Sequence, residues 1–335
     1  MLHHDTPMLH HDIIVIGSSA GGVETLMRLC AGLPVDLSAA VFIVQHISPT
    51  SKSVLPDLLT RAGPLPARHP VDGEAIQSGH IYVAPPDQHL LLREGSIMLR
   101  HGPQENRTRP AIDPLFRSAA VAYGPRVIGV VLTGLLDDGA AGLVAIRRCG
   151  GLCIVQDPDD AQWPEMPRRA IERTQPDHIV PISEMPALLA RLSHVSAGSP
   201  VQIPSALDLE TRIAAQEFDP VGMPALGLPS RLSCPQCGGV LNEVPDEGTI
   251  RFRCQTGHAF TSEGLMQAQT GELERALERA ARTHRDRVDL CRRMEQHAQS
   301  RPLTAARWHA AAEDAETAAT AIATAIAALR KPGVR

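Results

Sequence analysis

Short apolar runs rich in β-branched residues alternate with helical patterns from Asp12 to about Ser193, and this alternation constrains the fold most strongly. It is typical of a parallel sheet covered by helices on both faces. The sequence therefore predicts an α/β fold with a doubly wound, mostly parallel sheet. The expected strands are "IIVIG", "AAVFIVQH", "HIYVAP", "RVIGVVLTG" and "LCIVQD", and the expected helices lie at about 22–32, 52–62, 113–123 and 139–149.

Composition changes along the chain predict further parts. The pattern "HLLLREGSIMLRHG" has two strand-like arms around a glycine, which indicates a hairpin at the sheet edge. After residue 193 the chain becomes rich in Pro, Ser, Gly and Ala without a sustained period. We expect a disordered N-terminus over 1–11, a catalytic domain over 12–193, a linker over 194–230, a zinc-ribbon-like module over 231–261 and a helical tail over 262–335.

The last predicted helix carries an apolar stripe. Its members recur at alternating four- and three-residue steps: Trp308, Ala312, Ala315, Ala319, Ile322, Ile326 and Leu329. Such a stripe packs against another surface, most simply the preceding helix in an antiparallel hairpin. A surface for a partner or a second copy of the chain is the alternative.

Charge and hydropathy exclude several classes of protein. The net charge of −5 gives no general attraction to nucleic acid or to anionic membranes. No apolar run approaches the roughly 20 residues that a membrane-spanning helix needs, and the N-terminus lacks the features of a signal peptide. We expect a cytoplasmic protein that neither inserts into membranes nor binds nucleic acid.

The segment "IGSSAGG" follows the first predicted strand and admits two interpretations. A strand, a glycine turn and a helix start can bind phosphate, but a dinucleotide fingerprint needs glycine where Ser19 stands, and a P-loop needs a Gly-Lys-Ser/Thr ending. Gly-x-Ser-x-Gly at a strand-to-helix turn instead presents a nucleophile. The turn therefore favours Ser19 as a nucleophile, with nucleotide binding as the alternative.

Two later strands end in residues that could complete a catalytic triad. His46 ends the second strand, and Asp138 follows the strand "RVIGVVLTG". The carboxyl ends of parallel strands meet at one edge of a sheet, where His46 could accept the Ser19 proton and Asp138 could orient the imidazole. The order Ser19, Asp138, His178 would also satisfy a hydrolase and remains open here. Backbone N–H groups at Ala20 and near Leu135 are the candidate oxyanion donors.

The motifs "IGSSAGG", "VQH", "GHIYVAPPDQHL", "NRTRPAIDPLF", "VVLTGLLDDGAAG" and "MPRRAI" resemble those of the CheB-type chemotaxis protein-glutamate methylesterases, in that family's order. The resemblance implies a serine hydrolase that removes methyl groups from γ-glutamyl esters on the cytoplasmic helices of chemoreceptors, releasing methanol. It also implies deamidation of receptor glutamines. Ser19, His46 and Asp138 take the triad roles, and catalysis needs no cofactor.

The chain departs from the family pattern near the expected oxyanion site. Leu135 replaces a methionine whose backbone N–H donates, Leu136 replaces a glycine, and Ala20 replaces a threonine. A positive φ at position 136 would make the leucine unfavourable. The resemblance places Arg107 and Arg109 in the substrate cleft, where they could meet the acidic flanks of a receptor helix.

Regulation and overall role have alternatives. Family members commonly begin with a receiver domain, whereas only about a dozen residues precede the first predicted strand. A regulatory protein partner, the C-terminal region or constitutive activity would take its place. A catalytically weak regulatory or adaptor protein of a sensory system is the alternative function.

Four residues after the linker have the spacing of metal ligands. Cys234 and Cys237 form Cys-x2-Cys, and Cys254 and His258 form Cys-x3-His. Two such chelating turns suit tetrahedral Zn²⁺, and four protein ligands leave no open position for catalysis. The sequence therefore predicts a structural zinc site in a ribbon.

Overall fold

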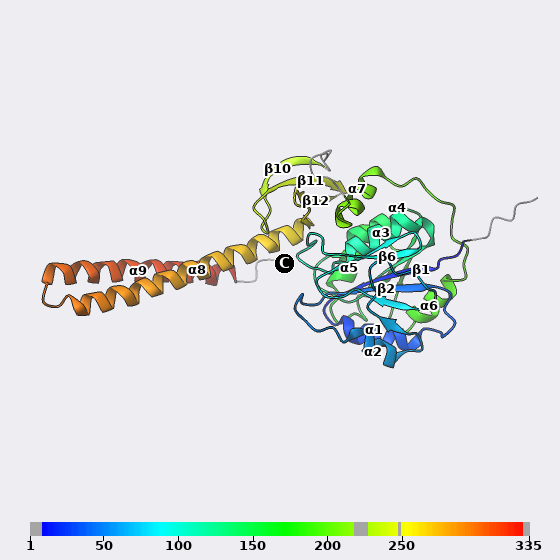
Figure 1. The fold of residues 1–335 in the computed structure, drawn as a ribbon, viewed down its shortest axis with the longest axis horizontal. Coiled ribbons are helices and arrows are strands. Elements are labelled where there is room, and N and C mark those ends of the chain that lie inside the picture. The colour runs from blue at the N-terminus through cyan, green and yellow to red at the C-terminus, as the bar shows by residue number, and fades with distance from the viewer. Residues whose placement is uncertain (1–8, 218–226, 247–248, 331–335) are drawn as a thin grey trace, which may run out of the picture. The chain divides into compact units, whose positions relative to one another are not determined.

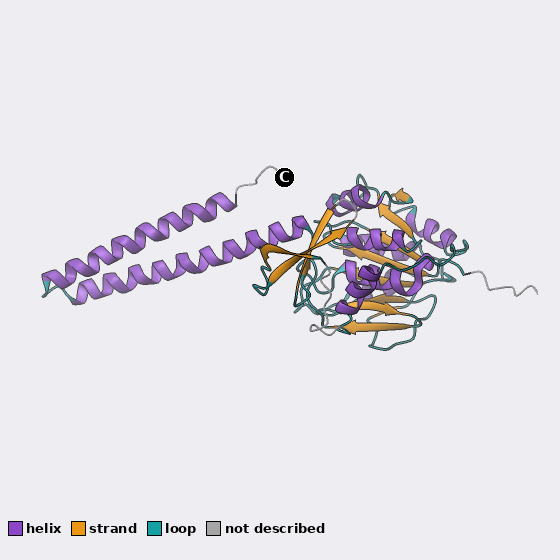
Figure 2. Ribbon diagram, turned by 90° about the horizontal axis from the view of Figure 1, so that it is seen from above, coloured by secondary structure: helices purple, strands orange, loops and turns teal. Residues whose placement is uncertain are grey.

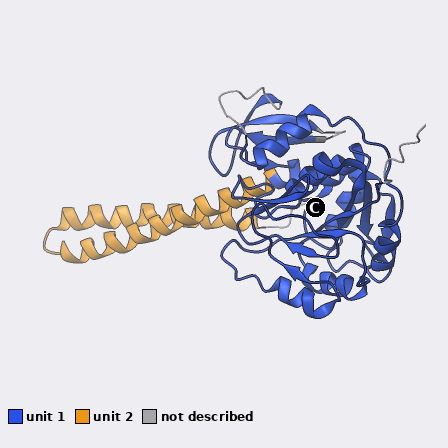
Figure 3. Ribbon diagram, turned by 45° about the vertical axis from the view of Figure 1, so that its right-hand side comes forward, with its two compact units in different colours: residues 1–264 blue, residues 265–335 orange. Residues whose placement is uncertain are grey.

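The computed structural model of the 335-residue chain describes residues 9–217, 227–246 and 249–330. It contains two compact units, residues 1–264 and residues 265–335 (Figure 3). The predicted triad and the cysteine cluster both lie in the first unit. No helix among the described residues is long and apolar enough to span a membrane.

A seven-stranded parallel sheet forms the centre of the first unit, which confirms the predicted α/β fold. Across the sheet the strands are β3 (Ala67–Arg68), β4 (Ile81–Val83), β2 (Ala40–Gln45), β1 (Ile13–Ser18), β7 (Val127–Val131), β8 (Leu152–Gln156) and β9 (His178–Val180). The chain proceeds from β1 toward β3 and β4, then returns to β7 on the other side of β1. The carboxyl ends of β1, β2 and β7 are therefore neighbours where the strand order reverses, and ligands bind there in folds of this kind.

Alternate residues of each central strand pack into two cores. Ile13 and Val15 of β1 contact the core under α3, α4, α5 and α7, whereas Ile14 and Ile16 contact the core under α1, α2 and α6. Figures 1 and 2 show the helices on the two faces of the sheet. Their bounds are α1 (Gly22–Gly32), α2 (Leu55–Ala62), α3 (Ile112–Tyr123), α4 (Ala140–Arg148), α5 (Glu165–Thr174), α6 (Met185–Leu192) and α7 (Ser205–Ala214), with a short 3-10 helix, η1 (Gly124–Arg126), after α3.

The predicted hairpin forms, but its predicted position at the sheet edge is wrong. Strands β5 (His89–Arg93) and β6 (Ser96–Arg100) make a separate two-stranded sheet. Leu92 and Ile97 belong to the core under α3, and the Leu92 N–H donates to Ser118 Oγ of α3 at 3.0 Å. The hairpin therefore lies over a helix, because both of its arms have apolar residues to bury.

Two segments expected to lack structure are partly ordered. Helix α7 lies inside the predicted linker, where Leu207 packs into the main core. In the predicted N-terminal extension, Leu9 accepts a backbone hydrogen bond from Ala197 at 2.7 Å and His10 forms a bridge with Ser196. Residues 1–8 of that extension lie outside the described residues.

Residues 228–246 and 249–260 form a four-stranded antiparallel sheet that contains the cysteine motifs. Its strands are β10 (Leu228–Ser233), β11 (Val240–Asp246), β12 (Thr249–Cys254) and β13 (Ala259–Phe260). We call this segment the ribbon. The clustering of contacts places it in the same compact unit as the parallel sheet.

Buried charges join the ribbon to the α/β layers. Arg253 of β12 donates to Glu105 at 2.9 Å and to Glu210 of α7 at 3.1 Å, and all three side chains are almost fully buried. Arg117 of α3 bonds Glu105 at 2.5 Å, and Arg251 bonds Glu210 through two hydrogen bonds. The ribbon is therefore docked by an ion network that spans the loop before α3, α3 itself and α7.

The second unit is an antiparallel helical hairpin. Most of α8 (Ser262–His297) and all of α9 (Pro302–Leu329) belong to it, and Arg330 bonds Glu274 and Glu278 from the far end of the chain. Ala312 and Ala315, from the predicted stripe, are buried. The hairpin interpretation of the stripe thus agrees with the structure.

The buried network makes a prediction about stability. Burial raises the pKa of Glu210, but the charges of Arg251, Arg117 and Arg253 lower it by a larger amount. The net pKa of Glu210 therefore lies below the ordinary 4.5. We expect Glu210→Gln to lower the free energy of unfolding at pH 7 by about 3 to 5 kcal/mol, because it leaves buried arginines without their counter-charge. Urea unfolding followed by Trp163 fluorescence in a Trp308→Phe background measures this loss.

Two comparisons make that measurement specific. A group whose pKa is lowered in the folded state stabilises the fold at pH values above its unfolded pKa. The difference in unfolding free energy between wild type and Glu210→Gln should therefore decrease as the pH falls below 4.5. Glu217→Gln is the control, since Glu217 pairs with Arg93 at the surface and should cost under about 1 kcal/mol. Equal losses in the two variants would contradict the role of the network.

Candidate active site

The turn between β1 and α1 is shaped around Ser19. Gly21 caps α1 with φ 72°, a conformation that glycine adopts without strain. A Cβ on Gly22 would lie 2.0 Å from Gln45 Oε1, so the turn leaves no room for a side chain there. The Ser19 N–H donates to Thr133 O of the loop after β7 at 3.0 Å. These constraints hold the serine at the carboxyl end of the central strand.

Gln45, which sequence reasoning did not single out, fixes this turn from β2. Its Oε1 accepts from Ser18 Oγ at 2.7 Å, and its Nε2 donates to Ser19 O at 2.8 Å and to His46 O at 3.1 Å. One buried amide therefore links the backbone of the serine to that of the histidine. The only feature of the sequence that could have indicated this role of Gln45 was its place inside the motif "VQH".

Ser19, His46 and Asp138 lie within hydrogen-bonding distance in that order. His46 Nδ1 is 3.2 Å from Ser19 Oγ, and His46 Nε2 is 2.7 Å from Asp138 Oδ2. The His46 side chain is 15% exposed and that of Asp138 only 2%. When the imidazole carries its proton on Nε2 and donates it to Asp138, Nδ1 can accept the proton of Ser19.

Asp138 lies at the N-terminus of α3. Its carboxylate accepts the N–H of Ile112 at 2.8 Å and that of Asp113 at 3.2 Å. Burial raises the pKa of Asp138, but the hydrogen bond and charge of His46 and these two amides outweigh it, so its net pKa is lowered. The acid is therefore held as a carboxylate that accepts from the imidazole.

Asp113 completes a reciprocal arrangement. Its Oδ1 accepts the N–H groups of Gly139 and Gly142 at the start of α4, the helix that follows Asp138. Burial and the charge of Asp138 raise the pKa of Asp113. Each aspartate thus caps the helix adjoining the other, which fixes α3 against α4.

Asn106 connects the two carboxylates. Its Nδ2 lies 3.2 Å from both Asp138 Oδ1 and Asp113 Oδ2, and its Oδ1 accepts the N–H of Thr261 at 3.2 Å. Asp137, beside the acid, instead accepts from Thr261 Oγ1 at 3.0 Å. The motif "NRTRPAID" contained Asn106, but nothing in it indicated contact with Thr261, 155 residues later.

Two backbone N–H groups near Ser19 are available as donors. Among the described residues, neither the Ala20 nor the Leu135 N–H has a partner, and the oxyanion role of both stays a prediction. Leu136 has φ 68°, so it occupies the left-handed conformation that a leucine adopts only at a cost. The replacement of the family's glycine by Leu136 therefore places strain directly after Leu135.

The two predicted substrate arginines differ in their surroundings. Arg109 donates twice to Asp87 Oδ1, at 2.9 and 2.7 Å, and once to Gly102 O at 2.6 Å, and its side chain is 15% exposed. Its guanidinium therefore braces the loop, and its role in binding substrate stays a prediction. Arg107 is exposed and has φ 67°.

The alternative triad with His178 does not fit the topology. His178 is the first residue of β9 and pairs with Ile154 of β8, which is parallel to it. It therefore begins the edge strand, three strands away from β1 and level with the middle of the sheet, whereas Ser19 and His46 follow the carboxyl ends of the central β1 and β2. Asp138 is bonded to His46.

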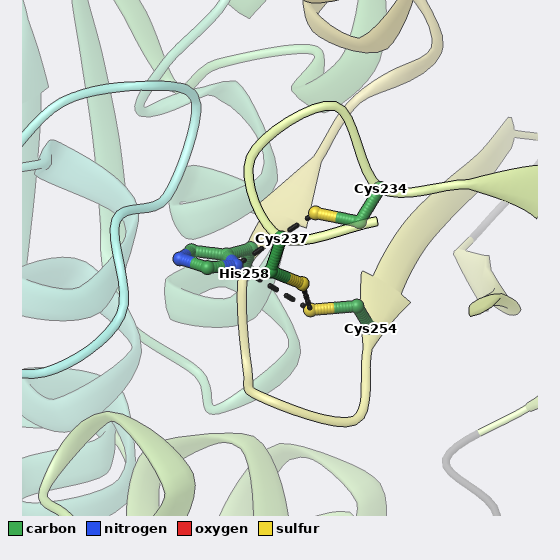
Figure 4. A group of neighbouring side chains, drawn as sticks. All are labelled: Cys234, Cys237, Cys254 and His258. Carbon is green, nitrogen blue, oxygen red and sulfur yellow. Dashed lines mark hydrogen bonds between the residues drawn. The ribbon is translucent and has the colours of Figure 1, made fainter. Parts of the chain in front are cut away.

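The four predicted metal ligands gather in the ribbon. The donor atoms of Cys234, Cys237, Cys254 and His258 all lie within 4.8 Å of one another (Figure 4). Cys237 Sγ is 3.7 Å from Cys254 Sγ, and His258 Nδ1 is 3.7 Å from Cys234 Sγ and 3.5 Å from Cys254 Sγ. A three-cysteine, one-histidine cluster of this kind could hold a metal ion.

Comparison with known proteins gives one consistent result. The family model described as CheB methylesterase matches residues 14–189. A protein of Leptospira interrogans is 38% identical over 185 residues, which are 55% of this chain and 96% of that relative. The crystal structure of the Thermotoga maritima CheB methylesterase catalytic domain superimposes with a TM-score of 0.52 at 32% identity, covering 54% of this chain and 98% of that domain.

Other relatives are longer than the matched part. The protein-glutamate methylesterase/protein-glutamine glutaminase 2 of Anaeromyxobacter dehalogenans is 37% identical over 54% of this chain and 53% of its own length. A protein-glutamate methylesterase/protein-glutamine glutaminase of Pyrococcus horikoshii is 33% identical over 55% of this chain and 51% of its own length. The chain thus matches about half the length of these two relatives.

Strain at Leu136 predicts an unequal effect of glycine at two adjacent positions. Leu136→Gly relieves a left-handed leucine, whereas Leu135→Gly, at a residue without a positive φ, only adds freedom to the unfolded chain. We expect the Leu136 variant to be more stable than the Leu135 variant by about 1 to 2 kcal/mol in urea unfolding. Equal stability of the two variants would show that position 136 carries no strain.

Proposed function

Because the chain belongs to the CheB methylesterase family, we propose that it hydrolyses γ-glutamyl methyl esters on the cytoplasmic helices of chemoreceptors and releases methanol. The same path with an amide substrate deamidates receptor glutamines and releases ammonia. The hydrogen-bonded series Ser19, His46 and Asp138 carries this proposal. The enzyme acts in the cytoplasm, where these receptor helices lie.

The reaction begins with attack by Ser19. Its Oγ adds to the ester carbonyl carbon while His46 Nδ1 takes the hydroxyl proton. The tetrahedral intermediate then collapses, the bond to the methoxy oxygen breaks, and His46 returns the proton so that methanol leaves. Water, deprotonated by His46, then attacks the acyl-Ser19 ester. The bond between the acyl carbon and Ser19 Oγ breaks, His46 returns the proton to Oγ, and the glutamate side chain is released.

Asp138 and the two free amides provide electrostatic stabilisation. The carboxylate holds the His46 proton on Nε2 and stabilises the imidazolium that forms in each step. The N–H groups of Ala20 and Leu135 stabilise the oxyanion, and such a donor contributes about 100- to 1000-fold in rate. Arg107, exposed in the loop before α3, contacts the acidic flank of the receptor helix.

The cysteine cluster binds a structural Zn²⁺. At a Zn–S distance of about 2.3 Å and a Zn–N distance of about 2.0 Å, tetrahedral ligand atoms are separated by about 3.8 Å for two sulfurs and by about 3.5 Å for a sulfur and a nitrogen. The Sγ–Sγ separation of 3.7 Å and the Sγ–Nδ1 separations of 3.7 and 3.5 Å within the cluster are close to these values. Zinc would hold Cys234, Cys237, Cys254 and His258 together and so stabilise a ribbon with a small core of its own.

The triad proposal is tested by methanol release from methylated receptor membranes. We expect Ser19→Ala and His46→Ala to lower kcat by about 1000-fold or more, because the nucleophile or its base is lost. His178→Ala is the matched control and should retain wild-type kcat. Equal methanol release by wild type and Ser19→Ala would overturn the function, and loss of activity in His178→Ala alone would overturn the choice of base.

The same assay separates the two loop arginines. Arg107→Gln should raise KM at unchanged kcat, with a difference from wild type that decreases at high salt. Arg109→Gln should instead lower the thermal stability, because it removes the bonds to Asp87 and Gly102. An unchanged KM in Arg107→Gln would exclude it as a substrate contact.

Elemental analysis tests the metal site. Full-length protein should contain zinc, and Cys237→Ser should lose most of it, because one of four ligands is removed. Cys291→Ser changes a cysteine of the helical hairpin and should leave the zinc content unchanged. Wild-type protein without bound metal, or equal metal in both variants, would exclude the assignment.

A further inference from the structure

A short series of hydrogen bonds leads from the ribbon to the proposed catalytic acid. Thr261, directly after β13, donates its N–H to Asn106 Oδ1 at 3.2 Å. Asn106 donates in turn to Asp138 Oδ1 at 3.2 Å, and Asp138 Oδ2 accepts from His46. Asn106 and Thr261 are both buried. One buried amide therefore separates the ribbon from the triad.

Strand β13 also pairs with the backbone of the loop that contains Asn106. The Asn106 N–H donates to Ala259 O at 2.9 Å, the Ala259 N–H donates to Gln104 O at 3.4 Å, and Glu105 and Ala259 form a parallel bridge. From the first chelating turn, between Cys234 and Cys237, Gln236 Nε2 donates to Gln104 Oε1 at 2.8 Å. Both chelating turns thus contribute to the position of the loop.

The cysteine cluster is adjacent to these contacts in sequence and in space. His258 immediately precedes Ala259, so a ligand of the cluster is next to the residue that pairs with the loop. In the same turn, Gly257 packs so closely that a Cβ there would lie 2.7 Å from Pro103 Cγ. Metal coordination at His258 would therefore fix the start of β13.

The loop needs such a restraint. Asn106 has φ 47° and Arg107 φ 67°, two consecutive residues other than glycine in the left-handed region. Each costs free energy that surrounding contacts must offset, though asparagine tolerates this conformation better than most residues. The Ala259 pairing, the Thr261 hydrogen bond and the Glu105 ion pairs with Arg117 and Arg253 supply those contacts.

We propose that the metal-binding ribbon is a positioning element of the active site, which acts through Asn106 to orient the Asp138 carboxylate toward His46. Metal binding at the cysteine cluster therefore controls the turnover of the hydrolase, although the cluster itself touches no substrate. The proposal rests on the hydrolase function and names a regulation of the same site. Asn106 and Thr261 are positioning residues, not catalytic ones.

Two consequences distinguish this arrangement from a purely structural role. Metal removal releases β13 from the loop and leaves Asp138 with fewer fixed donors, so kcat falls while substrate binding is retained. Because metal and Asn106 act on the same carboxylate in series, removing both should lower kcat little more than removing either one. If the two acted independently, their effects on the activation free energy would add, so the fold-losses in kcat would multiply.

The experiment uses full-length protein in metal-loaded and chelator-treated forms. We expect Asn106→Gly, which keeps the positive φ without strain, to lower kcat about tenfold or more at a KM within about twofold, because hydrogen bonds to charged groups are the stronger kind. Chelator-treated wild type should show a similar loss, reversed by Zn²⁺. Chelator-treated Asn106→Gly should lose no more than about twofold beyond the loaded variant.

A matched variant and a spectroscopic signal complete the test. Gln175→Gly replaces another polar residue with positive φ, at the end of α5, and should retain wild-type kcat and its response to chelator. The low-field proton resonance of the His46–Asp138 hydrogen bond reports the geometry without turnover. It should be present in loaded wild type and weakened by Asn106→Gly or by chelator. Trp163 fluorescence in a Trp308→Phe background shows that the unit remains folded.

Each result has a definite consequence. Unchanged kcat and an unchanged resonance after complete metal removal would overturn the proposal. So would a loss of kcat in chelator-treated Asn106→Gly that equals the two single fold-losses multiplied together. Loss of the native Trp163 fluorescence together with kcat on metal removal would assign the cluster to stability alone, against the proposal. Failure of the hydrolase function can be distinguished from failure of this proposal. In that case Ser19→Ala and wild type would release equal amounts of methanol, while the resonance would still respond to metal.

Discussion

The burial of the Asp138 charge is the constraint on which the arrangement depends. A carboxylate that is 2% exposed must receive hydrogen bonds from the protein, and here they come from His46 after β2, from two amides at the start of α3 and from Asn106. These donors belong to separate segments of the chain. The acid is therefore positioned only when the sheet, α3 and the loop before α3 are all in place.

The exchange of caps between Asp113 and Asp138 explains why the acid is rigid. Asp138 accepts from the N-terminus of α3, and Asp113, in the first turn of α3, accepts from the N-terminus of α4. Neither helix receives a side-chain cap from its own N-cap residue. A displacement of either helix would leave buried N–H groups and a carboxylate without hydrogen-bond partners. The free-energy cost of such unpaired groups is larger than the net stability that the hydrogen bonds provide when they are formed.

The sequence predicted the features that depend on local patterns and missed those that depend on contacts between distant segments. Continuous apolar runs predicted the central strands, and the strand ends located Ser19, His46 and Asp138. Strand β3 is too short, at two residues, to produce a pattern. Strand β9 has three residues like the predicted β4, but its residues are not buried as those of β4 are. Helix α7 falls in a Pro-rich segment, and its buried Glu210 resembles a surface residue until Arg251 and Arg253 are brought to it. The motif around Arg109 gave no sign of its hydrogen bonds to Asp87, because Asp87 comes from another loop.

The charges between the ribbon and the α/β layers do more than join them. Three arginines, at 117, 251 and 253, face two glutamates, at 105 and 210, which leaves one positive charge in excess. Burial and the charge of Asp138 raise the pKa of Asp113, and Arg117 and Arg251 oppose that rise. A buried ion network adds less stability than an apolar contact of equal size, but it specifies one register of the partners. Here the register brings the Thr261 N–H to Asn106. Arg251 of the ribbon opposes the rise in the pKa of Asp113, so the ribbon supplies geometry to Asp138 and positive charge to its neighbour.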